Sequence, residues 1–324
     1  MNAPVNPSRF FDLGPTAQNF KDAVLFGLSQ NPKRIPARYL YDERGSHLFE
    51  LIGDTDEYYL TRTELALLRS IAPEIATFAG PGPTVIEFGG GSSSKICTFL
   101  DALDRAAAFV SVDISTENLT RAADEIANHF PELQVSAIGA DFMNLARLPQ
   151  SIGGSGKRLG FFLGATVGNL PPRDAVRLLA KFRQLLGRYS GLVVGVDLKK
   201  DPKLLNAAYN DRKGINAAFN LNLLHRIARQ LDSDIDIRSF SYDAFYNADE
   251  SRIETHLRSL KDQQVRIAGH LVEFVAGEAI HIGSSYKYDI EEFGRVARDA
   301  GFLTVKAWTD RDSLYSVHYL RPID

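Results

Sequence analysis

The chain has 324 residues and a formal net charge of −3, so it can form one large domain or two moderate ones and has no strongly basic character for nucleic acid. Its composition, 44% hydrophobic and 24% charged, is typical of globular proteins. The single cysteine, Cys97, cannot form an internal disulfide, and the first residues lack the pattern of a signal peptide. No stretch approaches the roughly 18 apolar residues of a membrane span. We therefore expect a cytoplasmic monomer that binds neither nucleic acid nor membrane.

Short apolar runs alternate with amphipathic stretches of helical period through the middle of the chain. The expected strands are 84–89, 107–115, 133–142, 158–170 and 190–198. The expected helices between them are 93–107, 116–130 and 173–187. Strand and helix units of this length predict a parallel sheet with helices on both faces. The expected fold class is therefore α/β, with a doubly wound, Rossmann-like sheet.

The pattern changes after Asp201. A helical region at 206–231 precedes runs of strand period at 235–246, 252–260, 263–277 and 278–288. A helix at 289–302 and a hairpin of 302–309 with 314–322 close the chain and are expected to rejoin the first sheet. We therefore divide the chain into one domain of residues 62–200 and 287–324, and a second α+β lobe of residues 1–61 and 201–286.

Three consecutive glycines follow the first expected strand, in "VIEFGGGSSSK" at residues 85–95. Ligands of open α/β sheets bind at the carboxyl ends of the strands, and glycine lets them approach the backbone without meeting a Cβ. The spacing of Glu87, Gly89, Gly90 and Gly91 is the form expected for S-adenosylmethionine, with the glycines under its amino-acid tail. A P-loop and a dinucleotide site would each need glycine where Ser94 stands. A tight turn without any ligand is the alternative.

Acidic residues also end the next two expected strands. Asp113 stands about where an acid accepts the ribose hydroxyls in nucleotide-binding α/β folds. Asp141 ends the third strand, where a carboxylate can accept from an adenine amino group while the ring of Phe142 packs on it. One acid at a strand end is usually a solvated turn residue. Acids at three successive strand ends indicate that the cofactor is S-adenosylmethionine.

Several blocks resemble, in the same order, those of the histidine-specific Nα-methyltransferases of ergothioneine biosynthesis, a family that also contains dimethylallyltryptophan N-methyltransferases. The blocks are "RYLYDERGSHLFELIGDTDEYYLTRTE", "FLGATVGNLPP", "DLKKDPKLLNAAYNDRKGINAAFNLNLL" and "FVAGEAIHIGSSYKY". The resemblance extends from about Arg34 to Tyr319. It implies a class I methyltransferase domain with a second, substrate-binding lobe, and methylation of the α-amino group of a free amino acid.

The resemblance also implies roles for individual residues. Positions that line the cofactor fall on Glu87, Gly89, Gly90, Gly91, Lys95, Asp113, Asp141, Phe142 and Gly164. The substrate carboxylate is expected at Asn169 and Tyr209, which are neutral donors suited to an anion. Tyr41 is expected beside the amine, as a base or only as an orienting partner, and Tyr58 beside the side chain. The scattered histidines predict no metal site.

Two positions depart from the family's pattern for histidine. Members that use histidine carry a glutamate two residues before the serine of the last block, and here Gly283 precedes Ser285. A methionine that lines the imidazole pocket is replaced by Thr255. Losing the acid removes a charge-assisted hydrogen bond of about 1.5 to 3 kcal/mol, so we expect a larger or differently polar side chain, such as that of tryptophan or another aromatic amino acid. Alternatively, Ser284, His281 or a water restores the contact, and the substrate is histidine.

Two other classes of protein compete with an amino-acid methyltransferase. A non-catalytic S-adenosylmethionine-binding protein would be expected to lose the acceptor residues, yet Asn169 and Tyr209 are both present. A protein methyltransferase would need an open groove, whereas the family's pocket is closed. The sequence therefore favours an enzyme that acts on a small molecule.

Overall fold

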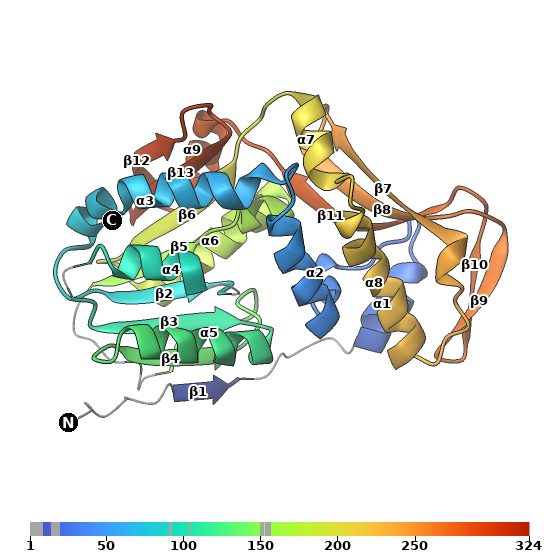
Figure 1. The fold of residues 1–324 in the computed structure, drawn as a ribbon, viewed down its shortest axis with the longest axis horizontal. Coiled ribbons are helices and arrows are strands. Elements are labelled where there is room, and N and C mark those ends of the chain that lie inside the picture. Colours follow the sequence, from blue (N-terminus) through green and yellow to red (C-terminus); the bar gives the residue numbers. More distant parts are fainter. Residues whose placement is uncertain are drawn as a thin grey trace. The chain divides into compact units, whose positions relative to one another are not determined.

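The computed structural model describes residues 9–13, 20–90, 93–103, 105–149, 152 and 157–323 (Figure 1). The chain divides into two compact units, which are described separately. The first unit comprises Met1–Thr16, Leu60–Lys199 and Lys287–Asp324, and the second comprises Ala17–Tyr59 and Lys200–Tyr286.

In the part of the first unit that the structure describes, eight strands form one sheet in the order β1-β4-β3-β2-β5-β6-β13-β12. Their bounds are β1 Arg9–Asp12, β2 Thr84–Phe88, β3 Ala108–Asp113, β4 Gln134–Gly139, β5 Arg158–Phe162, β6 Gly191–Asp197, β12 Phe302–Thr309 and β13 Tyr315–Pro322. Strands β1 to β6 run parallel, and β13 pairs antiparallel with β6 and β12. The expected doubly wound sheet and the return of the terminal hairpin to it are confirmed.

Helices cover both faces of this sheet. They are α3 Tyr59–Ala79, α4 Ser93–Leu100, α5 Thr116–His129, α6 Pro172–Leu186 and α9 Ile290–Asp299. Phe161 and Phe162 are successive residues of β5 and point to opposite faces. Phe161 lies 4.4 Å from Phe99 of α4, and Phe162 lies 5.1 Å from Phe182 of α6, both between ring centroids. With both faces covered, β2 and β6 are buried along their whole length, as expected for parallel strands.

One assignment from the sequence is wrong for the segment that forms β1. Residues 1–61 were placed in the second lobe, but Arg9–Asp12 pairs in parallel with β4, from Arg9 opposite Ser136 to Asp12 opposite Gly139. A strand joins a sheet through backbone hydrogen bonds, and these need no particular pattern of side chains. Four residues with an exposed burial pattern give no periodic signal of that pairing.

The described residues of the second unit form a three-stranded antiparallel sheet in the order β11-β8-β7, a separate hairpin of β9 and β10, and several helices. The strands are β7 Phe240–Asn247, β8 Arg252–Ser259, β9 Gln263–Ile267, β10 His270–Phe274 and β11 Ala279–Tyr286. The helices are α1 Phe20–Leu28, α2 Glu43–Gly53, α7 Pro202–Tyr209 and α8 Ile215–Gln230, with short 3₁₀ turns at Ala37–Leu40 and Ile237–Ser239. No helix among the described residues is long and apolar enough to cross a membrane.

The helical region expected at 206–231 consists of two helices. The break lies between α7 and α8, where Gly214 has a φ of +71°. The Asp211 carboxylate accepts from the backbone N–H groups of Ile215 and Asn216 at 2.8 and 2.7 Å. These bonds satisfy amide groups that a new helix leaves without partners, so α8 begins there.

Candidate active site

The turn after β2 is left-handed and open on one side. Gly89 has a φ of +84°, which glycine adopts without strain, and its N–H donates to the Val112 carbonyl at 2.8 Å. A Cβ at Gly89 would meet just one described side chain, the ring of Phe142 at 3.7 Å. This turn can therefore accept a ligand against its backbone. Gly91, the third glycine of the motif, lies outside the described residues.

Glu87 lies buried beneath the turn. A Cβ at Gly90 would lie 2.0 Å from Ser111 Oγ and 2.6 Å from Glu87 Oε2, so only glycine fits above this carboxyl. Burial raises the pKa of Glu87 to about 8, the nearby Lys95 lowers it, and Asp113 raises it. The carboxyl therefore keeps its proton to a higher pH than an exposed glutamate does. A cation bound nearby would favour its ionised form.

Asp113 and Asp141 stand at the carboxyl ends of the neighbouring strands β3 and β4. Asp113 Oδ1 accepts from the Ser115 N–H at 2.8 Å, and burial raises the pKa of this carboxyl. Asp141 Oδ1 accepts from the Met143 N–H at 2.9 Å, and its Oδ2 accepts from the Asn144 side chain at 2.8 Å. Local bonds thus fix both carboxylates at the edge of the sheet where ligands of this fold class bind.

A buried glutamate that the sequence analysis missed, Glu64 of α3, joins several of these segments. Its Oε1 accepts from the Gly164 N–H at 2.7 Å and from the Tyr315 hydroxyl at 2.5 Å. Its Oε2 pairs with Lys95 Nζ at 2.5 Å. The Tyr315 hydroxyl in turn accepts from the Ala165 N–H at 2.8 Å. We call these five residues the Glu64 cluster.

The Glu64 cluster holds an unusual backbone after β5. Gly164 and Ala165 are both left-handed, with φ values of +74° and +54°, and alanine adopts this conformation only at a cost. The short helix η2 (Thr166–Asn169) begins directly afterwards and ends on Asn169, which is exposed. The cluster therefore fixes the segment that connects Gly164, which is expected at the cofactor, with Asn169, which is expected at the acceptor.

The second unit brings two of the expected tyrosines together. The rings of Tyr58 and Tyr209 meet edge to face, with centroids 6.4 Å apart. Tyr41 lies in an aromatic group of its own, edge-on to Phe49 and Phe219 with both centroids at 5.4 Å. Each tyrosine therefore has a ring orientation fixed by aromatic neighbours.

The two departures from the family's pattern are cross-strand partners. Gly283 of β11 stands opposite Thr255 of β8, and the Thr255 hydroxyl donates to the Gly283 carbonyl at 3.2 Å. A Cβ at Gly283 would lie 3.0 Å from Thr255 Oγ1 and 3.7 Å from the Cβ of Ala37. Ser285, two residues further along β11, is buried on the same face of the sheet. The position at which the resemblance implies a glutamate in histidine-specific members is Gly283, so this face carries no acidic group there.

Ser284 and His281, the side chains of the alternative in which the contact is restored, bond to each other. Ser284 follows Gly283 along the strand and points to the opposite face. Its hydroxyl lies 3.0 Å from His281 Nε2, and the ring of His281 meets that of His256 at 5.2 Å between centroids. Among the described residues, no group of three or more histidine, cysteine, aspartate or glutamate side chains could hold a metal ion.

The family model described as "histidine-specific methyltransferase, SAM-dependent" matches residues 20–322. The chain belongs to this family. It is 36% identical to the histidine N-alpha-methyltransferase of Mycolicibacterium smegmatis over 300 residues, which cover 91% of this chain and 92% of that protein. It is 24% identical to the 4-dimethylallyltryptophan N-methyltransferase of Trichophyton verrucosum, with 94% of both chains covered. A solved S-adenosylmethionine-dependent methyltransferase of Clostridium acetobutylicum aligns with a TM-score of 0.47 at 9% identity, over 80% of this chain and 92% of that one.

The protein is therefore an S-adenosylmethionine-dependent N-methyltransferase of the histidine-methyltransferase type, built on a doubly wound sheet. The cofactor predicted from the glycine turn and the strand-end acids is confirmed by the family. The residues present fit it, because the open left-handed turn at Gly89 and the carboxylates at the ends of β2, β3 and β4 lie along one edge of the sheet.

Proposed function

We propose that this methyltransferase acts on the α-amino group of a free amino acid with an aromatic side chain, and that tryptophan is the first candidate. The observation that carries the proposal is the cross-strand pair of Thr255 and Gly283. The Thr255 hydroxyl donates to the Gly283 carbonyl, and Gly283 has no side chain, so this pair supplies no charged acceptor for an imidazole N–H. A site that has given up such a partner no longer selects for a substrate that needs it.

We assign recognition of the amino-acid backbone to neutral donors. Tyr209 of the second unit binds the carboxylate, because a phenol O–H group can donate to an anion without adding charge. Asn169 of the first unit is a neutral amide donor of the same kind. The edge contact of Tyr209 with Tyr58 orients its ring, and Tyr58 in turn faces the substrate side chain. In this proposal the second unit carries most of the residues that select the acceptor.

The residues of this chain contribute to the reaction mainly by orienting the substrate. S-adenosylmethionine, when bound, supplies an already activated methyl group. Tyr41 hydrogen-bonds the substrate amine, and its contacts with Phe49 and Phe219 fix the direction of that bond. The amine must be neutral to react. Tyr41 therefore either accepts the proton that the amine loses, as a base, or only orients the amine so that its lone pair points at the methyl group. Orientation of this kind can supply most of the acceleration.

L-Histidine is the second candidate, favoured by the 36% identity to a histidine N-alpha-methyltransferase over nearly the whole of both chains. A panel of free amino acids, each paired with its amide, tests both the class and the choice. Tryptophan should be methylated faster than histidine, and tryptophanamide should be a poor substrate because it has no carboxylate. Equal rates on tryptophan and its amide would refute the carboxylate assignment, and a clear preference for histidine would favour the second candidate.

A further inference from the structure

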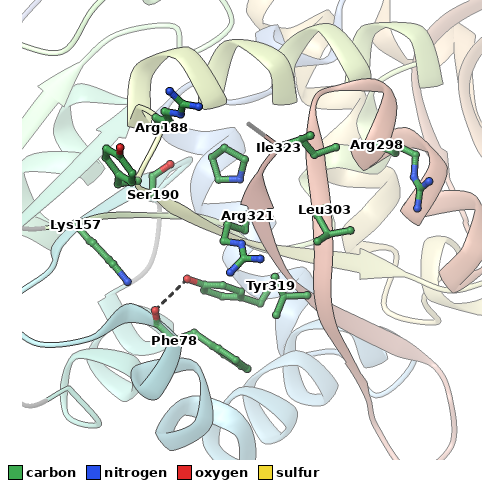
Figure 2. A pocket seen from close by; sticks show the side chains of 12 residues that line it. Phe78, Lys157, Arg188, Ser190, Arg298, Leu303, Tyr319, Arg321 and Ile323 are labelled. Carbon is green, nitrogen blue, oxygen red and sulfur yellow. Dashed lines mark hydrogen bonds between the residues drawn. The ribbon is translucent and has the colours of Figure 1, made fainter.

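A cavity of about 680 Å³ lies in the first unit (Figure 2). It lies at the sheet edge opposite the glycine turn. Lys157 directly precedes β5 and Ser190 directly precedes β6, so both mark the amino ends of parallel strands. Arg321 stands near the end of β13, which runs antiparallel to β6 and finishes at the same edge. The seven residues of β6 separate the two edges by about 20 Å. The cavity is therefore distinct from the site at the carboxyl ends of the strands.

Positive charge is concentrated in this cavity. Its lining contains Lys157, Arg188, Arg298 and Arg321, and no aspartate or glutamate among the described residues, although the chain as a whole has a net charge of −3. Within the described part of the chain, the side chains of Lys157, Arg298 and Arg321 form no ion pair or hydrogen bond with one another or with other residues. The like charges of Lys157, Arg298 and Arg321 around one hollow repel each other and favour an anion between them.

Apart from Ser190, the remaining side chains of the lining are aromatic or apolar. Tyr189 is 80% exposed, and Leu303 and Ile323 are 42% and 43% exposed, which is high for such side chains. The floor includes Tyr319, whose hydroxyl donates to the Phe78 carbonyl at 3.3 Å (Figure 2). The cavity therefore offers a flat ring and aliphatic surface next to its cations.

We propose that this cavity binds a small phosphorylated molecule that carries an aromatic ring, of the chemical class of a nucleoside diphosphate, at a site separate from that of the methyl donor. Arginine guanidinium groups bind phosphate oxygens through two parallel hydrogen bonds, and lysine adds a compact charge. The exposed Tyr189 ring provides a stacking surface for a base. The volume is within the usual range of small-molecule sites, about 300 to 1,000 Å³.

Calorimetric titration of ADP into the enzyme saturated with S-adenosylhomocysteine tests the proposal, because the saturating ligand keeps the adenine of ADP out of the cofactor site. ADP should bind, and the Arg298→Gln/Arg321→Gln variant should bind it at least tenfold more weakly. The matched control is Arg177→Gln/Arg238→Gln, which removes two exposed arginines that each pair with a nearby aspartate. This control should leave the affinity unchanged. Inorganic pyrophosphate should bind wild type more weakly than ADP and show the same loss in the cavity variant.

Three results would overturn the proposal. The first is an absence of heat with ADP at millimolar concentration. The second is equal ADP affinity in the cavity variant and the control variant. The third is a single-stranded RNA oligomer that binds at the cavity arginines while ADP does not, which would show a nucleic-acid surface instead. Because Arg298 and Arg321 are exposed, thermal unfolding of the variants should match that of wild type and exclude a folding defect.

Discussion

Replacement of Glu64 by glutamine should both destabilise the first unit and weaken cofactor binding. The glutamate accepts from Gly164 and Tyr315 through one oxygen and pairs with Lys95 through the other. Glutamine has the same shape but one amide NH₂ group. In one orientation this group faces the Lys95 ammonium, and in the other it faces the Gly164 N–H. Either orientation sets a donor against a donor in a site where Glu64 is 1% exposed.

The loss in free energy of unfolding follows from these contacts. Breaking a buried ion pair by removing one partner costs about 3 to 5 kcal/mol, and the partial exposure of Lys95 places the value near the lower end. We therefore expect Glu64→Gln to lower the free energy of unfolding by about 3 kcal/mol in urea titrations. Because the cluster holds the left-handed backbone at Gly164 and Ala165, we also expect S-adenosylhomocysteine to bind about 10-fold to 100-fold more weakly by calorimetry.

Glu74→Gln is the matched control, because Glu74 lies on the same helix and pairs with Lys306 at the surface. An exposed pair contributes about 0 to 1 kcal/mol, so this variant should remain close to wild type in both assays. If Glu64→Gln unfolds at the same urea concentration as Glu74→Gln and keeps wild-type affinity for S-adenosylhomocysteine, the reasoning about the Glu64 cluster is wrong.

Three further predictions concern single residues. Asp113→Ala should weaken S-adenosylhomocysteine binding tenfold or more in calorimetry, through loss of a charged acceptor; an unchanged affinity in the folded variant would remove Asp113 from the site. The pKa of Glu87 is raised from 4.5 to about 8, so between these pH values the folded state without ligand binds more protons than the unfolded state. The free energy of unfolding should therefore fall as the pH rises through this range, by up to about 1.4 kcal/mol per pH unit. Glu87→Gln should flatten this slope in urea titrations between pH 5 and pH 8, and an identical slope in both proteins would contradict the assignment. Tyr209→Phe should raise the KM for the amino acid several-fold and leave the affinity for S-adenosylhomocysteine unchanged; a wild-type KM would exclude its hydroxyl from the carboxylate site.

The parallel sheet could be predicted because its strands are uninterrupted apolar runs separated by amphipathic helices, a pattern that only a sheet covered on both faces produces. The Glu64 cluster could not be predicted, because its bonds connect residues up to 251 positions apart. One signal was available: Glu64 lies on the apolar face of its helix, between the buried Leu60 and Leu68. A charged side chain at such a position is buried only when it has partners.

The pairing of Gly283 with Thr255 also could not be predicted from the sequence. Each was recognised as a departure from the family's pattern, but their position opposite each other depends on the register of two strands. The register shifts at a bulge between His281 and Gly283. A one-residue slip there would turn Gly283 to the other face of the sheet, and no periodic pattern identifies a bulge in advance.

The most direct test of the altered acceptor site is a competition assay between histidine and tryptophan, on wild type and on Gly283→Glu/Thr255→Met. The second change refills the wall of the pocket with the methionine that the family's pattern implies at position 255. The account predicts that wild type prefers tryptophan. It also predicts that the double variant shifts relative kcat/KM toward histidine by about 10-fold to 100-fold, the effect of one charge-assisted hydrogen bond, while Gly283→Gln/Thr255→Met shifts it much less. Efficient use of histidine by wild type, with a ratio that the double change leaves unaltered, would contradict the account.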